Sequence, residues 1–242
     1  MVKSYAVIIP AYNEEALLGT TIATIRRAMN SIGAEGELIV VDNNSTDATA
    51  EIARQAGADR VVFEAHNQIA KARNAGARVS KAEWLVFVDA DTQVPEKTLQ
   101  KALELLREGK VAGGGARLVM DQPVSRIVGY IVKGWEQFSE KLGYAAGSFF
   151  FCRRDAFLDA GGFEEAVYAG EEVWLARKIK RWGKKRGLPF KIIEEPPVET
   201  SGRKSNWFST RAFILQIAVL LLFPWAARSR RLCSLWYQRP AG

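Results

Sequence analysis

Two aspartates separated by one residue follow a short apolar run in the first half of the chain. Residues 84–88 read Trp-Leu-Val-Phe-Val, and Asp89, Ala90 and Asp91 come directly after them. A five-residue run of this kind predicts a strand buried on both faces, and open α/β sheets bind ligands at the carboxyl edge of such strands. Two close carboxylates repel each other unless a cation lies between them, and their hard oxygens suit Mg²⁺ or Mn²⁺. The pair therefore indicates a metal site, with a charged strand-to-loop turn as the plain alternative.

Acidic and aromatic side chains follow two further apolar runs. Residues 10–15 read Pro-Ala-Tyr-Asn-Glu-Glu after the first run, and residues 42–47 read Asp-Asn-Asn-Ser-Thr-Asp after the second. A dinucleotide-binding turn at the first position would be rich in glycine, but residues 10–15 contain none. Carboxylates there suit a nucleoside, because they accept hydrogen bonds from base N–H groups and ribose hydroxyls. For Glu15 and Asp47 we favour a structural role at helix starts.

Short β-branched runs alternate with helical patterns through the first half of the chain. The predicted strands are 7–9, 38–41, 61–63 and 85–88, and the predicted helices are 14–31, 47–57, 69–79 and 95–108. This alternation predicts an α/β fold with a mostly parallel central sheet and helices on both faces. Beyond Gly109 the pattern predicts strands at 111–120, 148–153 and 190–193 and helices at 123–142 and 171–182.

The acids belong to four ordered motifs that resemble those of family 2 glycosyltransferases. The motifs are Ile-Ile-Pro-Ala-Tyr-Asn-Glu-Glu at 8–15, Val-Asp-Asn-Asn-Ser-Thr-Asp at 41–47, Ala-Arg-Asn-Ala-Gly at 72–76 and Val-Asp-Ala-Asp at 88–91. The resemblance continues through Gly-Gly-Phe-Glu-Glu at 161–165 and Gly-Glu-Glu at 170–172, and covers roughly residues 5–203. It implies a single domain of the glycosyltransferase A type, which transfers a sugar from a nucleotide-diphosphate sugar, inverts the anomeric carbon and depends on Mn²⁺ or Mg²⁺.

The resemblance also implies roles for individual residues. Four of them would hold the nucleoside, usually uridine in this family, so that a UDP-sugar is the favoured donor: Pro10, Tyr12, Glu14 and Asp42. Asp89 would lie near the ribose and the metal, and Asp91 would bind the metal itself. Arg73 lies on the predicted helix before the Asp-x-Asp strand, where its charge would face the nucleotide or, alternatively, belong to a solvated helix face.

Inverting transfer also needs a base that removes the proton of the acceptor hydroxyl. In the family this base is the Asp of a Glu-Asp pair that opens a helix, and here the pair reads Glu171-Glu172. The resemblance therefore makes Glu172 the base, with Glu171 as the fallback. The departure from Asp adds one methylene, so the extra reach must be absorbed elsewhere. The structural alternative is that both acids stabilise a helix amino terminus.

Positive charge and apolar residues gather toward the C-terminus. The net charge is +7, and residues 176–242 contain 15 Lys or Arg against three acids. Of residues 212–227, 15 of 16 are apolar or Pro, whereas a spanning helix needs about 20 such residues. We expect residues 207–237 to contact a membrane surface, with packing on the domain or in a dimer interface as the alternatives. Arg203, in a basic loop before this segment, is expected to close over the diphosphate.

The expected organisation is one catalytic domain and a tail. Residues 1–205 form the glycosyltransferase domain, with a nucleotide-binding half at 1–109 and an acceptor half at 110–205, and residues 206–242 form an apolar and basic helical tail. Two distant cysteines and a first segment unlike a signal peptide predict a cytoplasmic protein, peripheral on the cytoplasmic face of the membrane.

The predicted function is metal-dependent transfer of a single sugar to a hydroxyl acceptor that is lipid-linked or close to the membrane. A different class of function is a non-catalytic module of the same fold that binds sugar nucleotides or membranes and has lost its base. Nucleic-acid binding is disfavoured, because the basic tail interleaves its charges with a long apolar run rather than with isolated stacking rings. The donor sugar, the acceptor and the oligomeric state are not specified by the sequence.

Overall fold

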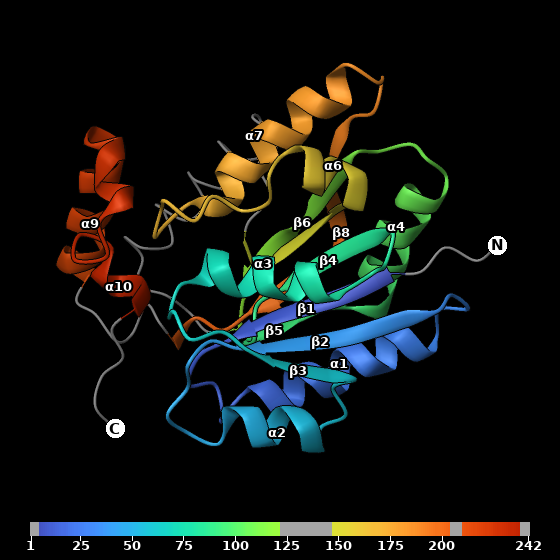
Figure 1. The fold of residues 1–242 in the computed structure, drawn as a ribbon, viewed down its shortest axis with the longest axis horizontal. Coiled ribbons are helices and arrows are strands. Elements are labelled where there is room, and N and C mark those ends of the chain that lie inside the picture. The colour runs from blue at the N-terminus through green and yellow to red at the C-terminus, as the bar shows by residue number, and fades with distance from the viewer. Residues whose placement is uncertain (1–4, 122–146, 204–209, 238–242) are drawn as a thin grey trace.

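A mixed eight-stranded sheet forms the centre of the fold. The computed structural model describes residues 5–121, 147–203 and 210–237 (Figure 1). The strand order is β3-β2-β1-β4-β7-β6-β8-β5. The pairs β3–β2, β2–β1, β1–β4 and β6–β8 are parallel, whereas β7 is antiparallel to both of its neighbours and β5 is antiparallel to β8. The strands are Tyr5–Ala11 (β1), Gly36–Asp42 (β2), Arg60–Phe63 (β3), Trp84–Val88 (β4), Thr92–Gln93 (β5), Gly113–Met120 (β6), Phe149–Arg153 (β7) and Phe190–Thr200 (β8).

Strand β1 shows why the sheet is covered on both faces. All seven of its residues are buried. Tyr5, Val7 and Ile9 belong to one buried cluster, and Ala6 and Ile8 belong to another. Because consecutive side chains of a strand point to opposite faces, both faces of this strand exclude water.

Helices supply the cover. The first buried cluster includes residues of α1, α2 and α4, and the second includes residues of α3, α6 and α7, so the two groups pack on opposite faces (Figure 1). The helices are Leu18–Asn30 (α1), Thr49–Gln55 (α2), Ile69–Val79 (α3), Glu96–Arg107 (α4), Arg154–Asp159 (α6) and Glu171–Lys184 (α7).

Helix α3 lies unusually close to the sheet because of one glycine. A Cβ atom at Gly76 would lie 2.4 Å from Cγ2 of Ile8 and 3.1 Å from Cγ2 of Val41. Only a residue without a side chain permits this approach. The glycine thus fixes the depth of a helix that also carries Arg73, a residue of the candidate site.

The predicted fold class is confirmed, and the differences concern boundaries and short elements. The first helix begins at Leu18 rather than at residue 14, because residues 12–17 form an irregular loop after β1. The last strand continues to Thr200 instead of ending at residue 193, and β5 and α6 were not predicted. The predicted helix at 123–142 lies outside the described residues.

The C-terminal segment comprises three short elements: Thr210–Leu222 (α9), the 3₁₀ helix Pro224–Arg228 (η1) and Ser234–Tyr237 (α10). They lie beside the domain, on the side toward which the carboxyl ends of β1 and β2 point (Figure 1). Among the described residues, no helix has the length and apolar character required to cross a membrane.

Candidate active site

The carboxyl ends of three neighbouring strands bring the predicted donor-binding residues to one edge. Ala11, at the end of β1, pairs with Asp42 at the end of β2, and β4 lies on the other side of β1. Asp89 and Asp91 follow β4 directly. Pro10 is buried at the same edge, and Tyr12 is half-buried in the loop beyond it. The parallel register of these strands explains why acids distant in the sequence converge.

The first loop at this edge is held by hydrogen bonds to the second. Asn13 adopts a left-handed backbone conformation with φ of 49°, and its side chain accepts a hydrogen bond of 2.8 Å from the backbone N–H of Thr46. The backbone N–H of Glu14 donates to Oγ1 of Thr49 at 2.8 Å. These contacts carry the Glu14 carboxylate inward, so that the residue is only 3% exposed. Asp42 is also buried and accepts a hydrogen bond from the backbone N–H of Ser45 at 3.0 Å.

Glu15 and Asp47 have a structural role, but not the expected one at helix starts, because α1 begins at Leu18 with no acid in its first turn and the N-cap of α2 is Ala48. The Asp47 carboxylate accepts hydrogen bonds from the backbone N–H of Thr49 at 2.9 Å and from that of Glu15 at 3.2 Å. Glu15 in turn accepts a hydrogen bond from the backbone N–H of Ala48. Burial acts to raise the pKa of Asp47, but its hydrogen bonds with Thr49 and Glu15 outweigh burial and lower it. The two acids join the loops before α1 and α2.

Arg203 reaches the donor edge from the end of β8. Its guanidinium donates to the Glu14 carboxylate and lies 3.9 Å from Oδ2 of Asp91. Asp91 also accepts, through its backbone carbonyl, a hydrogen bond of 3.1 Å from the N–H of Ser201. The long strand β8 therefore places one cation beside two carboxylates that follow the neighbouring strands β1 and β4. Its position beside the Asp-x-Asp pair agrees with the predicted neighbourhood of the diphosphate.

Arg73 lies beneath the edge rather than on it. The residue is 1% exposed, and its guanidinium donates to Asp89 and Glu171 at 2.7 Å each and to the carbonyl of Gly147 at 2.9 Å. Its Cζ also lies 5.1 Å from the ring centre of Phe163. Burial acts to lower the pKa of Arg73, but Asp89 and Glu171 more than compensate, so that it stays charged. Two positions were expected for Arg73, one facing the nucleotide and one on a solvated helix face. The buried position seen here matches neither of them.

The two glutamates at the start of α7 have different environments. Glu171 is 3% exposed and points to Arg73, whereas Glu172 is half-buried. A Cβ atom at Gly147 would lie 3.5 Å from Cδ of Glu172 and 3.2 Å from Nη2 of Arg73. The backbone at Gly147 therefore lies close to both side chains. Burial and, second, the negative charge of Glu171 raise the pKa of Glu172 to about 8. The positive charge of Arg73 acts in the opposite direction. A carboxyl group with such a pKa is poised to exchange a proton near neutral pH.

The loop before α7 is fixed by residues that the sequence analysis did not assign. Asn74 donates to the carbonyl of Phe163 and accepts from its N–H, both at 2.9 Å, and also donates to the Glu165 carboxylate. Gln68 donates to the carbonyls of Glu165 and Val167. The only signal for Asn74 was its place in the Ala-Arg-Asn-Ala-Gly motif. Helix α3 therefore orients the loop that leads into the acid pair.

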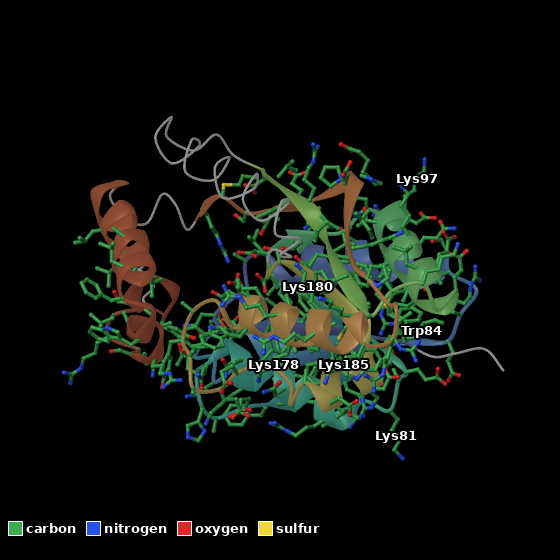
Figure 2. All side chains as sticks on the ribbon, turned by 90° about the horizontal axis from the view of Figure 1, so that it is seen from above. Lys81, Trp84, Lys97, Lys178, Lys180 and Lys185 are labelled. Carbon is green, nitrogen blue, oxygen red and sulfur yellow. The ribbon has the colours of Figure 1, made fainter. Side chains whose placement is uncertain are left out.

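Helix α7 continues away from these acids with a basic outer surface. Lys178, Lys180 and Lys185 are distributed along it (Figure 2). Lys178 lies 3.4 Å from the Glu164 carboxylate, and Lys180 contacts the ring of Phe190. Lys178 and Lys180 therefore contact neighbours of α7 rather than the acidic edge, and Lys185 is exposed.

The Asp-x-Asp carboxylates fit a divalent cation that is shared with a substrate. Among the residues that the structure describes, no three His, Cys, Asp or Glu side chains are grouped as a metal-binding cage. Mg²⁺ is usually held by one or two carboxylates together with substrate phosphates, so two aspartates are a sufficient protein contribution. Asp91 is 6% exposed and Asp89 is half-buried, and each already lies near one arginine. The chemistry of this donor set agrees with the predicted metal site.

Solved structures of similar fold contain nucleotides and metals. One is a mannosyltransferase from Pyrobaculum calidifontis in complex with GDP-Man and Mn²⁺. The alignment covers 96% of this chain and 73% of that one, with a TM-score of 0.63 and 19% identity. This chain also aligns to glucosyl-3-phosphoglycerate synthase from Mycobacterium tuberculosis in complex with Mg²⁺ and UDP over 91% of itself and 78% of that chain, with a TM-score of 0.61 and 17% identity. At these identities the likeness concerns the fold.

Sequence comparisons lead to the same group of proteins. The chain is 30% identical over 122 residues to undecaprenyl-phosphate 4-deoxy-4-formamido-L-arabinose transferase of Pectobacterium carotovorum, covering 48% of itself and 37% of the relative. It is 35% identical over 104 residues to validoxylamine A glucosyltransferase of Streptomyces hygroscopicus, covering 40% of itself and 24% of the relative. The alignments therefore span about a third or less of these relatives. The family model of glycosyl transferase family 2 matches residues 6–160, which is more than half of the chain, and the protein belongs to that family.

Proposed function

We propose that the protein transfers a sugar, with inversion, from a nucleotide-diphosphate sugar to a hydroxyl acceptor in a reaction that depends on Mn²⁺ or Mg²⁺. The observation that carries the proposal is the network in which Arg73 joins Asp89 at the donor edge to Glu171 at the start of α7. It links the Asp-x-Asp pair, which we propose binds the metal, to the helix start that carries Glu172. Donor binding and proton removal are the two tasks that this reaction requires.

The donor is assigned to the edge formed by β1, β2 and β4. Buried Glu14 and Asp42 would accept hydrogen bonds from the base and ribose, with Pro10 and Tyr12 lining the nucleoside. UDP-sugars are the favoured donors, and a related structure with UDP and Mg²⁺ supports the choice, although a mannosyltransferase with GDP-Man has the same fold.

Asp91 and Asp89 are the proposed metal ligands. When bound there, a divalent cation would offset the negative charge that develops on the departing diphosphate. Asp91 would hold the cation, while Asp89, fixed by its 2.7 Å hydrogen bond from Arg73, would lie near the ribose as well. The protein then needs no acid to protonate the leaving group.

Glu172 is the proposed base. Its ionised carboxylate would take the proton of the acceptor hydroxyl, whose oxygen forms a bond to the anomeric carbon from the face opposite the diphosphate. The bond from that carbon to the diphosphate oxygen breaks, and its electron pair leaves with the nucleoside diphosphate. Glu171 is already engaged by Arg73, so the fallback role predicted for it is no longer favoured.

A thermal-shift screen against nucleotide sugars tests the donor assignment. We expect a UDP-sugar to raise the melting temperature with Mn²⁺ and to raise it less without the metal, because a ligand that binds only the folded state stabilises it. Asp91→Ala should lose the additional rise in melting temperature that Mn²⁺ gives. Asp159→Ala, on the surface of α6, should keep that rise. The absence of any shift with uridine or guanosine sugars would contradict the donor assignment.

Arg203 is proposed to move from Glu14 to the diphosphate when the donor binds. Its side chain is 20% exposed, and its guanidinium already lies beside Asp91, where the diphosphate is expected. We predict that Arg203→Ala weakens the apparent donor affinity by about 10-fold or more, because a hydrogen bond to a charged group contributes about 1.5–3 kcal/mol. Arg117→Ala, which removes a partly exposed ion pair to Glu195, is the control. Unchanged donor affinity and turnover in Arg203→Ala would refute this role.

The acceptor is proposed to be lipid-linked or close to the membrane. One relative carries undecaprenyl-phosphate in its name, and a peripheral position on the cytoplasmic face would give access to such a substrate. The second candidate function is a non-catalytic module that binds sugar nucleotides. It is favoured by one observation, that Glu172 stands where the family has the Asp of its Glu-Asp pair. A module would bind the donor with Mn²⁺ without releasing the sugar, so a sugar-release assay separates the two functions.

A further inference from the structure

The C-terminal segment, residues 210–237, has an anchored part, residues 226–233, and a projecting part, which is α9 with residues 223–225. Ala226, Ala227 and Cys233 are buried, and the carbonyl of Ala227 accepts a hydrogen bond of 2.6 Å from the N–H of Tyr168. Arg230 donates to the side chain of Asn67 at 3.2 Å. These contacts attach residues 226–233 to the loops that lead into α7 and α3.

The anchored part lies close to the acid pair. The ring of Tyr237 meets that of Tyr168 edge-on, with 5.6 Å between their centres. The charge of Glu171 contributes, after burial, to raising the pKa of the Cys233 thiol to about 11. The segment therefore lies beside the loop that leads into Glu171 and Glu172.

The projecting part exposes large apolar side chains. Five of the nine exposed large hydrophobic residues among those described belong to this segment: Leu215, Leu222, Phe223, Trp225 and Leu232, with exposures of 66, 73, 48, 64 and 38%. Helix α9 stands apart from the domain in both views (Figures 1 and 2). Four of them lie within residues 215–225, and water-exposed apolar residues concentrated in one segment indicate an interaction surface.

The charge around this surface identifies its partner. Arg228, Arg230 and Arg231 are exposed, and residues 200–242 contain no Asp or Glu. Such a surface complements an anionic one, whereas a second copy of the same segment would bring like charges together. The 13 residues of α9 give a length of about 20 Å, less than the roughly 30 Å of a bilayer core, so the helix suits the interface and not a span. Exposed Phe and Trp beside arginines are typical of the headgroup layer.

We propose that α9 and η1 insert their exposed apolar side chains into the headgroup layer of an anionic bilayer, with Arg228 and Arg231 against lipid phosphates, while the anchored part holds the acid pair close to that surface. The bilayer contact stands independently of the proposed function. Delivery of a lipid-linked acceptor to Glu172 from the bilayer rests on it.

Vesicle co-sedimentation of the full chain tests the bilayer contact. We expect binding to phosphatidylcholine vesicles that contain 30% phosphatidylglycerol to exceed binding to pure phosphatidylcholine by at least about 10-fold. The variant Leu215→Ser/Leu222→Ser/Trp225→Ser should reduce binding to the anionic vesicles by at least about 10-fold. The control is Phe63→Ser/Leu158→Ser, which removes apolar residues that are 63 and 59% exposed outside the segment and should bind as the unmodified chain does.

Arg228→Gln/Arg231→Gln should weaken binding about 10- to 30-fold and remove most of its salt dependence, since each arginine near an anionic surface contributes about fivefold.

Two results would overturn the inference. One is equal vesicle binding by the triple serine variant and its control. The other is a dimer, seen by size-exclusion chromatography with light scattering, that the triple variant disrupts while vesicle binding is absent, since the apolar face would then be covered by a second copy. A melting-temperature shift with a UDP-sugar and Mn²⁺ shows that each variant is folded, and this shift tests the donor site separately from the bilayer contact.

Discussion

Replacing Arg73 with Met is expected to lower the free energy of unfolding by about 3–5 kcal/mol, because removing one partner of a buried ion pair leaves the other charges unpaired. Asp89 and Glu171 would both lose a hydrogen bond of 2.7 Å at a site where Arg73 is 1% exposed. Urea denaturation at pH 7 measures the effect. The loss should shrink as the pH falls, since protonation neutralises the unpaired carboxylates.

The control for this experiment lies on the same helix. Arg78 is 61% exposed and lies 3.6 Å or more from its acidic partners, so Arg78→Met should change the free energy of unfolding by only about 0.5 kcal/mol or less. Arg73→Lys should fall between the two, because a single ammonium group lacks the fork that reaches both carboxylates. Equal losses for Arg73→Met and Arg78→Met would mean that Arg73 does not hold the site together.

Glu172→Gln is expected to reduce the turnover rate by about 10²- to 10⁴-fold, which is the usual contribution of a general base. In the unmodified chain the rate should rise with pH and level off above about 8, because burial and Glu171 raise the pKa of Glu172 to about 8 and only the ionised form takes a proton. The pH dependence of sugar release measures both effects. Glu194→Gln, at an exposed position on β8, should keep the unmodified rate and profile.

Stability provides an independent measurement of the same pKa. The folded-state pKa of Glu172 is above its ordinary value of 4.5, so between 4.5 and about 8 the folded state binds more protons than the unfolded state. Its contribution to stability is fully present below 4.5 and is lost as the pH rises to about 8. Gln resembles the protonated acid, so Glu172→Gln should remove this part of the decline. An unchanged pH dependence of both stability and rate would contradict the assignment of Glu172.

The donor edge was predictable because its signals are local. Apolar runs of strand length identify β1, β2 and β4, and the parallel arrangement that follows from alternating helices brings their ends together. The acids that follow each run, Asp42, Asp89 and Asp91 among them, therefore share an edge. A structural role for Glu15 and Asp47 was predictable, but its form was not: the two acids join the loops before α1 and α2 instead of lying at helix starts.

The pairing of side chains across the fold was not predictable in this way. Arg73 and Glu171 are 98 residues apart, and no periodic pattern specifies that they meet. Arg203 reaches Glu14 only because β8 extends to Thr200, whereas the sequence pattern predicted a strand that ends at residue 193. The hydrogen bonds of Asn74 to the loop before α7 likewise depend on how closely α3 packs on the sheet.

The C-terminal segment shows how two alternatives read from one sequence can each describe part of a structure. Packing on the domain describes the part around Ala227 and Cys233, which is buried. Exposure of Leu222 and Trp225 fits the membrane-facing alternative for the other part. Apolar composition alone could not divide the segment, because both environments attract the same residue types.

The most direct test of the central claim compares Asp91→Ala and Glu172→Gln in one experiment that measures UDP binding by calorimetry and Mn²⁺-dependent sugar release from a UDP-sugar. We assign the leaving group to Asp91 and proton removal to Glu172. Asp91→Ala is expected to lose both metal-dependent UDP binding and sugar release, whereas Glu172→Gln should bind UDP as the unmodified chain does and release at least about 100-fold less sugar. Sugar release by Glu172→Gln at the unmodified rate, or metal-dependent UDP binding that survives in Asp91→Ala, would contradict these assignments.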